Sequence, residues 1–222
     1  MEKNDPLAIM AQVQVLRMFR EVGALISDDH LVYASGKHGS DYFDKDRMYP
    51  HTHQISRLCQ SIAMSFAGSG VEAVVAPEKG GIILSQWVAY HLSEMTGREV
   101  LAFYAEKTEE GGFIIKRGNA RAILPGKKVL VVEDVLTTGG SVKKVIEAVI
   151  ALGCELVGLG VLCNRGQVKP EDVANPARMV ALLDLALPMY DEADCPFCKE
   201  GRPINTVLGK GKEYLAKKAQ SG

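Results

Sequence analysis

The residues with the clearest chemical potential lie in residues 129–141, Val-Leu-Val-Val-Glu-Asp-Val-Leu-Thr-Thr-Gly-Gly-Ser. Four apolar residues predict a buried strand, and two adjacent acids, Glu133 and Asp134, follow it. A turn rich in glycine and hydroxyl groups then leads into a predicted helix. Backbone N–H groups and hydroxyls in such a turn, together with the positive end of a helix, can bind a phosphate dianion.

The acid pair needs a different group on the ligand, because carboxylates repel phosphate. Vicinal sugar hydroxyls with a magnesium ion nearby would suit Glu133 and Asp134. In open parallel sheets, ligands bind at the carboxyl ends of the strands, where these acids are expected. The segment therefore predicts a phosphorylated sugar as the ligand. The alternative is purely structural: the acids would cap the helix and the glycines would form a turn. That alternative does not explain why two acids and a cluster of hydroxyl residues occur together here.

Other phosphate motifs do not fit the chain. The pattern G-x-x-x-x-G-K-[ST] does not occur. The G-x-G pairs Gly158/Gly160 and Gly209/Gly211 lack the third glycine and the strand–turn–helix setting of a dinucleotide site.

Strands and helices alternate around the acid-containing segment. Helices are predicted over 52–67, 81–95 and 141–152, and strands over 73–76, 100–104, 129–132, 156–162 and 179–185. The strands are continuous apolar runs, as expected when both faces of a sheet are covered. We therefore expect an α/β fold with a central, mostly parallel sheet and helices on both faces.

A smaller element is expected to precede this core. Apolar residues at helical spacing predict a helix over 7–24, and two short strands, 31–34 and 41–44, predict a hairpin around the polar turn 35–40. We expect one domain over 1–222, with an N-terminal helix and hairpin hood, an α/β core, and a C-terminal segment ending in a short basic helix. Their expected ranges are 1–48, 49–190 and 191–222.

Composition limits the partners. Lys plus Arg number 26 and Asp plus Glu number 27, so the formal net charge of the 222 residues is -1. Proteins that bind duplex nucleic acid or anionic membranes usually carry a strong excess of positive charge, so neither is expected as a partner. The polar start, residues 1–6, is followed by no apolar signal region, and no apolar run approaches the length of a membrane span. A cytoplasmic protein is expected.

The five cysteines are an odd number and widely spread, except for the pair Cys195 and Cys198. One C-x-x-C supplies only half of a zinc site, and no second C-x-x-C or H-x-x-x-H follows it. Structural thiols, a metal site completed by another segment or subunit, and a redox pair all remain open.

The acid-containing segment resembles the signature for 5-phosphoribosyl 1-pyrophosphate (PRPP) in type I phosphoribosyltransferases. Further segments are similar to orotate phosphoribosyltransferases: 35–44 to their N-terminal hairpin, 76–84 to their pyrophosphate loop, Asn164-Arg165 to their base-recognition arginine, and 195–203 to a C-terminal segment of one bacterial branch. The resemblance covers most of the chain and implies the type I phosphoribosyltransferase fold.

By this resemblance, Glu133 and Asp134 are catalytic residues that hold the ribose hydroxyls of PRPP. The 5′-phosphate would be bound by the turn residues Val135, Leu136, Thr137, Thr138, Gly139, Gly140 and Ser141. Lys79 and Gly80 are further candidate PRPP contacts, although Lys79 lies one position before the lysine of the better-known pattern. The resemblance implies Mg²⁺ as the cofactor, held mainly by PRPP near the two acids, with no protein ligand assigned.

The resemblance also assigns the orotate contacts. Arg165 would pair with the orotate carboxylate, which its planar guanidinium suits, and Thr137 would lie close to the base. Phe43 would stack on the pyrimidine ring, and Lys37 would reach the pyrophosphate or the base. Each has a plainer alternative: an ion pair at the surface for Arg165, a core position for Phe43, and an exposed turn for Lys37.

The long polar insertion 106–124 is expected to carry a mobile lid over 106–117, although a plain surface hairpin would also fit. Lys107 is the catalytic candidate for neutralising the leaving pyrophosphate, with Lys116 and Arg117 behind it. Glu109 and Glu110 are unexpected beside an anion.

The implied reaction is Mg²⁺-dependent pentosyl transfer from PRPP to orotate, giving orotidine 5′-phosphate and pyrophosphate for UMP synthesis. Orotate is already anionic, so catalysis would rest on positioning and on stabilising leaving-group charge. A homodimer is implied by the resemblance. The alternatives are a transferase for another base such as a purine, a non-catalytic PRPP-sensing regulator that binds nucleic acid, and a salvage enzyme with a different donor.

Overall fold

The computed structural model of the chain describes residues 6–33 and 35–221, and its contacts divide the chain into two compact units. The first unit contains the residues up to Val15 and Tyr49–Leu185. The second unit contains Leu16–Met48 and the residues from Ala186 onward. The sequence did not predict that the hood and the C-terminal segment form one unit.

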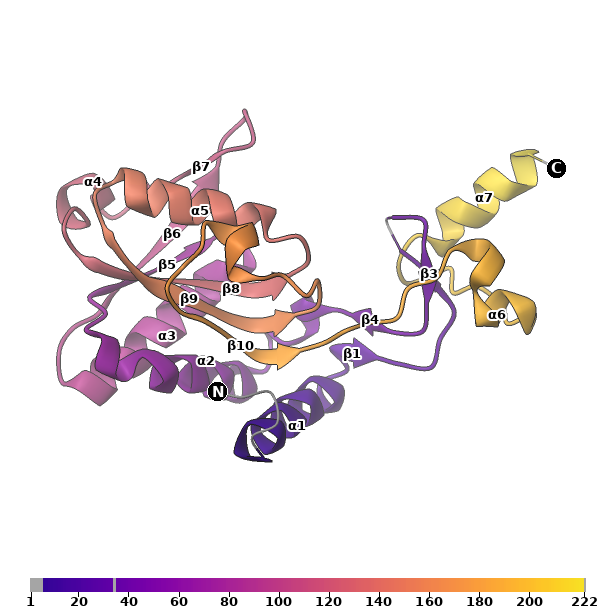
Figure 1. The fold of residues 1–222 in the computed structure, drawn as a ribbon, viewed down its shortest axis with the longest axis horizontal. Helices are drawn as coiled ribbons and strands as arrows, with labels where there is room; N and C mark the ends of the chain where they lie inside the picture. The colour runs from indigo at the N-terminus through magenta and orange to yellow at the C-terminus, as the bar shows by residue number, and fades with distance from the viewer. Residues whose placement is uncertain (1–5, 34, 222) are drawn as a thin grey trace. The chain divides into compact units, whose positions relative to one another are not determined.

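A six-stranded sheet forms the centre of the first unit (Figure 1). Its strand order is β10-β9-β8-β5-β6-β7, and every pairing is parallel except that of β7 with β6. The strands are β5 (Ala73–Pro77), β6 (Leu101–Lys107), β7 (Phe113–Ile114), β8 (Lys128–Leu136), β9 (Glu155–Asn164) and β10 (Met179–Asp184). The predicted α/β fold and all five predicted strands of the sheet are confirmed.

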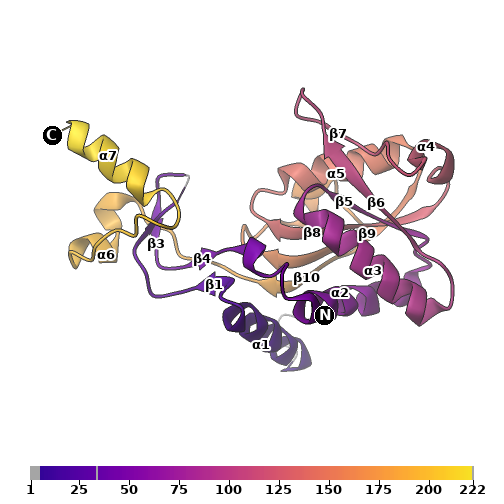
Figure 2. The same ribbon diagram turned by 180° about the vertical axis from the view of Figure 1, so that it is seen from behind.

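Helices cover both faces of this sheet, as predicted. α2 (Thr52–Phe66) and α3 (Gly80–Thr96) lie on one face and α5 (Gly140–Ala151) on the other (Figures 1 and 2). A Cβ on Gly160 of β9 would lie 2.5 Å from Cγ2 of Ile62 in α2, so this glycine allows the helix to pack closely on the strand. The G-x-G pair of β9 thus has a packing role.

Strand β8 is longer than predicted, because it continues through both acids to Leu136. The sequence placed its end at Val132, where the apolar run stops. Parallel pairing with β9 continues beyond that point, from Val132↔Gly160 to Leu136↔Asn164. Pairing with the neighbouring strand therefore extends β8 past its apolar residues.

The predicted hairpin of the hood is wrong in its pairing. β2 (Leu31–Val32) pairs with β3 (His38–Gly39), which lies inside the predicted turn. β4 (Tyr42–Phe43) pairs instead with β1 (Leu25–Ile26). The turn is tighter than expected, since the Tyr33 amide donates to the Lys37 carbonyl oxygen at 2.8 Å. Ala34, part of the predicted first strand, lies outside the described residues.

The remaining elements are short or lie at the two ends of the chain. The predicted helices at the two ends of the chain are confirmed as α1 (Pro6–Glu21) and α7 (Gly211–Ser221). Between them lie α4 (Ala120–Ile123), α6 (Pro196–Lys199) and the 3-10 turns η1 (Lys45–Arg47), η2 (Ala67–Ser69), η3 (Pro170–Val173) and η4 (Glu192–Asp194). In the described part of the chain, no helix has both the length and the apolar character needed to cross a membrane.

Candidate functional site

The two acids lie in the last part of β8, toward the carboxyl edge of the sheet. Glu133 and Asp134 are 8% and 6% exposed. The pairing of β8 with β5 ends at Val131, so both acids lie beyond the strand pairing on that side. Buried carboxylates are costly unless they accept hydrogen bonds. The acids therefore stand at the position where open parallel sheets bind ligands.

Asp134 is fixed by two donors. The amide of Val135 donates to its Oδ1 at 2.6 Å, and the hydroxyl of Tyr49 donates to its Oδ2 at 2.5 Å. A carboxylate oxygen can accept more than one hydrogen bond, so these two contacts do not by themselves exclude a ligand hydroxyl. Asp134 is thus held in one orientation by a residue from a distant part of the sequence.

The loop between β5 and α3 packs directly on this pair. A Cβ on Gly80 would lie 2.1 Å from the Tyr49 hydroxyl oxygen and 2.2 Å from Asp134 Oδ2. No side chain fits there, which explains why this position holds a glycine. The predicted pyrophosphate loop and the acid pair are therefore brought together, and Lys79 lies exposed beside them at the start of α3.

The turn after β8 is open to solvent, as a phosphate site requires. Thr137, Thr138, Gly140 and Ser141 are exposed, and the Gly140 amide donates to Thr138 Oγ1 at 3.4 Å. Gly139 precedes α5 with φ of 75°, and its Cβ would lie 2.5 Å from Cγ1 of Val173. The positive φ and the close approach both require glycine at this position.

Arg165 contacts the turn after β8, the predicted phosphate site. Its Nε donates to the Thr137 hydroxyl at 3.0 Å, and the amides of Arg165 and Gly166 both donate to the Leu136 carbonyl oxygen at 3.0 Å. A Cβ on Gly166 would lie 1.7 Å from the Thr137 carbonyl oxygen. The structure therefore joins the predicted base-recognition residue to the predicted phosphate turn.

Asn164 shapes the loop that carries Arg165. Its Nδ2 donates to the Val168 carbonyl oxygen and its Oδ1 accepts from the Val168 amide, both at 3.0 Å. These paired bonds close the loop after β9. Asn164 is buried, so its contribution is to position Arg165 rather than to meet a ligand.

The insertion after β6 forms a hairpin with β7. The Thr108 amide donates to the Gly112 carbonyl oxygen at 3.0 Å, and Lys144 Nζ of α5 donates to the Gly111 carbonyl oxygen at 2.6 Å. Glu109 and Glu110 are exposed at the turn. The segment is therefore an ordered hairpin in this structure, and the lid role stays a prediction.

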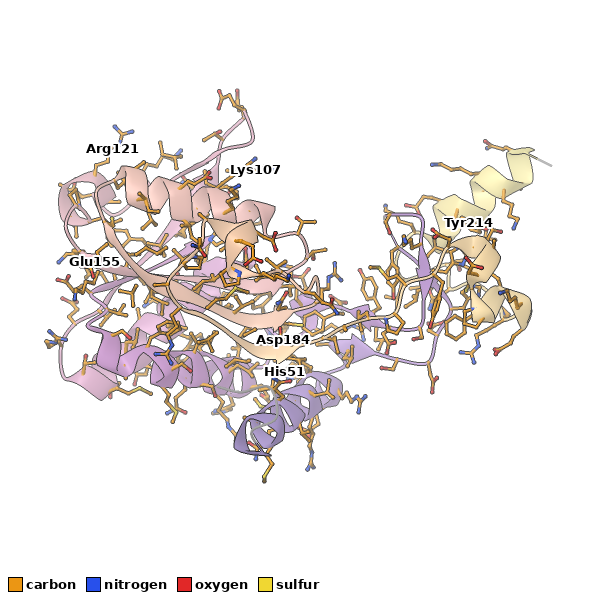
Figure 3. The ribbon with its side chains drawn as sticks, viewed as in Figure 1. His51, Lys107, Arg121, Glu155, Asp184 and Tyr214 are labelled. Carbon is orange, nitrogen blue, oxygen red and sulfur yellow. The ribbon has the colours of Figure 1, made fainter. Side chains whose placement is uncertain are left out.

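The cations of the hairpin have different surroundings. Glu106 accepts from Arg117 at 2.5 Å and lies 2.9 Å from Lys116 Nζ, and hydrogen bonds from Arg117 and then Lys116 lower the pKa of the Glu106 carboxyl. Lys107 lies exposed at the end of β6 (Figure 3), and among the described residues its ammonium forms no ion pair. Glu106 thus pairs with both Lys116 and Arg117 and balances one of their two charges, whereas Lys107 has no such partner among the described residues.

The backbone of Lys107 is held by the loop between β5 and α3. Its amide donates to Oε1 of Glu78 at 2.8 Å, and the Glu78 amide donates to the Ala105 carbonyl oxygen at 2.9 Å. The structure therefore brings the start of the hairpin beside the loop that contains Lys79.

The other two predicted orotate contacts lie in the second unit. Phe43 is buried there, with its ring edge-on to Phe19 at a centroid distance of 4.9 Å. Lys37 Nζ lies 3.7 Å from Oδ2 of Asp191. Packing and an ion pair account for both side chains without a ligand, and their contacts with orotate stay predictions.

Sequence reasoning missed two residues of this site. Tyr49 carries no local signal, because it lies 85 residues before its partner Asp134. Gly166 directly follows the predicted Arg165, yet nothing in the sequence shows that it touches the turn after β8. The contact of Gly166 arises because β9 lies beside β8, whereas Tyr49 reaches Asp134 from the segment that precedes α2.

Comparison with known proteins places this geometry in a family. The family described as "Phosphoribosyl transferase domain" matches residues 48–186. The orotate phosphoribosyltransferase of Desulforamulus reducens is 40% identical over 195 residues, which cover 87% of this chain and 95% of that protein.

Solved structures show the same fold. The orotate phosphoribosyltransferase of Aeropyrum pernix has a TM-score of 0.62 at 24% identity, covering 77% of this chain and 93% of that one. The orotate phosphoribosyltransferase of Mycobacterium tuberculosis H37Rv in complex with PRPP has a TM-score of 0.59 at 23% identity, covering 79% of this chain and 97% of that one.

Proposed function

The chain belongs to the orotate phosphoribosyltransferase family, and on that premise we propose that it transfers the 5-phosphoribosyl group of PRPP to orotate. The products are orotidine 5′-phosphate and pyrophosphate, and the reaction serves UMP synthesis. The proposal is carried by one continuous segment, 133–141, at the end of β8 and the start of α5. Its two acids are buried and the turn that follows them is exposed.

This run can bind the two halves of the phosphoribosyl group. Glu133 and Asp134 accept hydrogen bonds from the ribose hydroxyls. The 5′-phosphate takes the hydroxyls of Thr137, Thr138 and Ser141 and the N–H groups of the turn, where the N-terminus of α5 adds its favourable dipole. The acids repel phosphate, so the ribose site at Glu133 and Asp134 and the phosphate site at the turn are separate parts of the same segment.

Orotate is selected by its carboxylate. The Arg165 guanidinium, held on Thr137 by its Nε, keeps its terminal nitrogens for a carboxylate oxygen pair. This contact would place the base beside the ribose. Uracil lacks the carboxylate, and purines differ in shape, so Arg165 is the proposed specificity residue.

Mg²⁺ is the proposed cofactor. It takes oxygen ligands and keeps several waters, and the carboxylates of Glu133 and Asp134 offer the oxygen donors that it prefers. PRPP would supply most of the ligands. When bound, the ion neutralises charge on the leaving pyrophosphate.

The remaining groups act on the leaving group and on solvent. Lys107 lies at the base of the hairpin, next to the pyrophosphate loop, where a cation stabilises the charge that develops on pyrophosphate. The hairpin 106–117 is the proposed lid that keeps water away from the reacting carbon. Protection of this hairpin from proteolysis by PRPP would support the lid, and unchanged cleavage would contradict it.

We also propose, from the family membership, that the protein is a cytoplasmic homodimer. Light scattering coupled to size exclusion measures the mass in solution, and a monomer at enzymatic concentrations would contradict the dimer. Nucleic acid and membranes are not proposed as partners.

The function is tested by incubating the protein with PRPP, Mg²⁺ and one base at a time. Orotate, uracil, adenine and hypoxanthine are compared, and pyrophosphate release is measured. Release with orotate alone is the expected result. Release with a purine alone would favour a salvage transferase, and PRPP binding without release would favour a regulator.

Replacement of Arg165 by alanine is expected to raise the KM for orotate about 100-fold, because a charge-assisted pair with the carboxylate is lost. The KM for PRPP should change little. Arg165→Lys should remain impaired, since an ammonium cannot reproduce the planar pairing. Steady-state kinetics with each substrate varied separately measures both constants, and an equal rise in both would contradict the assignment.

Replacement of Lys107 by alanine is expected to lower kcat about 10- to 100-fold, because one cation near the leaving pyrophosphate is removed. The backbone bond to Glu78 is retained in the variant, so the hairpin should fold normally. Arg121→Ala is the control, since Arg121 is an exposed cation in α4 (Figure 3). If both variants behaved alike, Lys107 would have no special role.

A further inference from the structure

Four metal-binding side chains gather in the second unit, and none of them is among the residues assigned above. The side chains of His30, His38, Cys195 and Cys198 each offer one ligand atom, and these atoms lie within 4.8 Å of one another. No other such group of metal-binding residues occurs in residues 6–33 and 35–221. The sequence supplied only the C-x-x-C half of this cluster.

The distances within the cluster match a tetrahedral zinc site. His30 Nε2 lies 3.0 Å from His38 Nδ1, 3.7 Å from Cys195 Sγ and 3.5 Å from Cys198 Sγ, and Cys198 Sγ lies 3.3 Å from His38 Nδ1. Bonds of about 2.0–2.3 Å to a central Zn²⁺ give edges of roughly 3.3–3.8 Å between ligand atoms. The three distances that involve a sulfur fall in this range, and the separation of the two nitrogens, 3.0 Å, is slightly shorter.

The fold explains how the histidines converge. In the β2–β3 pair, Val32 is opposite His38, and side chains alternate along a strand, so His30 and His38 share one face. The two histidines are therefore close in space although seven residues lie between them in the sequence. No linear zinc motif contains this spacing, which is why the sequence did not reveal it.

The cysteines reach the same face through a backbone connection. The amide of His38 donates to the Tyr190 carbonyl oxygen at 2.8 Å, and the Tyr190 amide donates back to the His38 carbonyl oxygen at 2.8 Å. The chain then turns through η4 and α6, which place both cysteines beside the histidines. Tyr214 of α7 (Figure 3) packs edge-on against the His38 ring at a centroid distance of 5.2 Å.

The surroundings orient His30 as a ligand. Its Nδ1 lies 2.7 Å from the carbonyl oxygen of Arg202, which only accepts hydrogen bonds, so Nδ1 carries a proton. In the neutral ring, Nε2 then has a free electron pair, and it is Nε2 that faces the cluster. A hydrogen bond from the second ring nitrogen to a carbonyl is the usual support of a metal-bound histidine.

Charge and burial also fit a divalent cation. His30, His38 and Cys195 are 1%, 0% and 0% exposed, and Cys198 is half-buried. Thiols are weak donors, so they are poor partners for buried imidazole nitrogens. Two thiolates and one Zn²⁺ sum to zero charge, which makes the occupied site inexpensive to bury.

We propose that His30, His38, Cys195 and Cys198 bind one structural Zn²⁺ that joins the hood to the C-terminal segment. All four positions are filled by the protein, which is the pattern of structural sites, whereas catalytic zinc keeps one position open. The ion links residues 165 positions apart, such as His30 and Cys195, within a unit that has only short strands. Zinc binding therefore contributes to folding of the second unit.

The test begins with the metal content of the full chain, purified without a histidine tag under reducing conditions. Mass spectrometry is expected to find about one zinc ion per chain. Cys198→Ser should reduce this to roughly a tenth or less, because a hydroxyl is a poor zinc ligand. Cys154→Ser is the matched control and should keep its zinc, since Cys154 lies in the first unit outside the cluster.

A second measurement covers the case in which Cys198→Ser does not fold. The wild-type chain is exchanged with Co²⁺, and tetrahedral coordination by two thiolates should give intense visible bands together with thiolate-to-metal charge transfer. Removal of the metal with a chelator should lower the melting temperature, and return of Zn²⁺ should restore it. Octahedral, weakly coloured cobalt would overturn the proposal.

Other outcomes also decide the matter. A chain without zinc whose Cys195 and Cys198 form a disulfide once the reductant is removed would establish a redox pair instead. A chain whose zinc survives in Cys198→Ser would place the metal elsewhere. A melting temperature that does not respond to chelation would show that the cluster has no structural metal.

Discussion

Replacing Asp134 by asparagine is expected to lower kcat/KM for PRPP about 1,000-fold while the fold is retained. The Val135 amide can only donate, so the variant's carbonyl oxygen must face it, and the new amide group must face Tyr49. The Tyr49 hydroxyl can rotate and accept, which keeps both native contacts in place. What is lost is the negative charge and an acceptor for the ribose hydroxyls.

The fall in kcat/KM should be the same with any base, because Asp134 is proposed to contact PRPP and not the base. Initial rates with PRPP varied at saturating orotate measure it, and thermal unfolding checks that the fold persists. Glu155→Gln is the control, since Glu155 lies at the start of β9 (Figure 3) and forms only an exposed ion pair of 3.7 Å with Lys128. A near-normal rate for Asp134→Asn would remove this carboxylate from the mechanism.

The sheet could be predicted from the sequence because its strands are buried on both faces. Continuous apolar runs then mark each strand without a competing helical pattern, and all five predicted strands of the sheet are present. The error at β8 has a physical cause. Glu133 and Asp134 end the apolar run, but the hydrogen bonds to β9 continue to Leu136, so tertiary pairing extends the strand.

The hood was harder to predict because its strands have two residues each. So short a segment carries no periodicity, and a polar turn does not reveal which strands pair across it. The same limit concealed the metal-binding cluster. His30 and His38 are joined by strand register, and Cys195 joins them through the backbone pair of Tyr190 with His38.

The candidate site shows which part of function is local in sequence. The acids and the turn are consecutive, so the sequence alone suffices to propose a chemistry for them from the residue types and their order. The position of Arg165 depends instead on β9 lying beside β8, which brings the ends of both strands together. The contact between Gly166 and Thr137 packs the loop that carries Arg165 tightly against the turn after β8. A substitution of Gly166 therefore disturbs this packing directly.

Replacing Gly166 by alanine is expected to lower kcat/KM about 100-fold for both substrates, because misplacement by about 1 Å is enough to cost that much. The new Cβ would lie 1.7 Å from the Thr137 carbonyl oxygen and 2.6 Å from its carbonyl carbon, so the backbone must move. That movement separates the Arg165 loop from the phosphate turn. Overpacking of this kind also costs about 1–3 kcal/mol of stability, so the melting temperature should fall by several degrees.

The pattern distinguishes this variant from Arg165→Ala, which should affect orotate alone. Calorimetric titration with PRPP in the absence of orotate is the sharpest readout, because in the proposed assignment the turn holds the 5′-phosphate without any contact with the base. Gly68→Ala is the matched control, since a Cβ there meets no atom within 4 Å. If Gly166→Ala bound PRPP normally and lost only orotate affinity, the loop would position Arg165 without constraining the phosphate turn, and the coupling argued from this contact would be wrong.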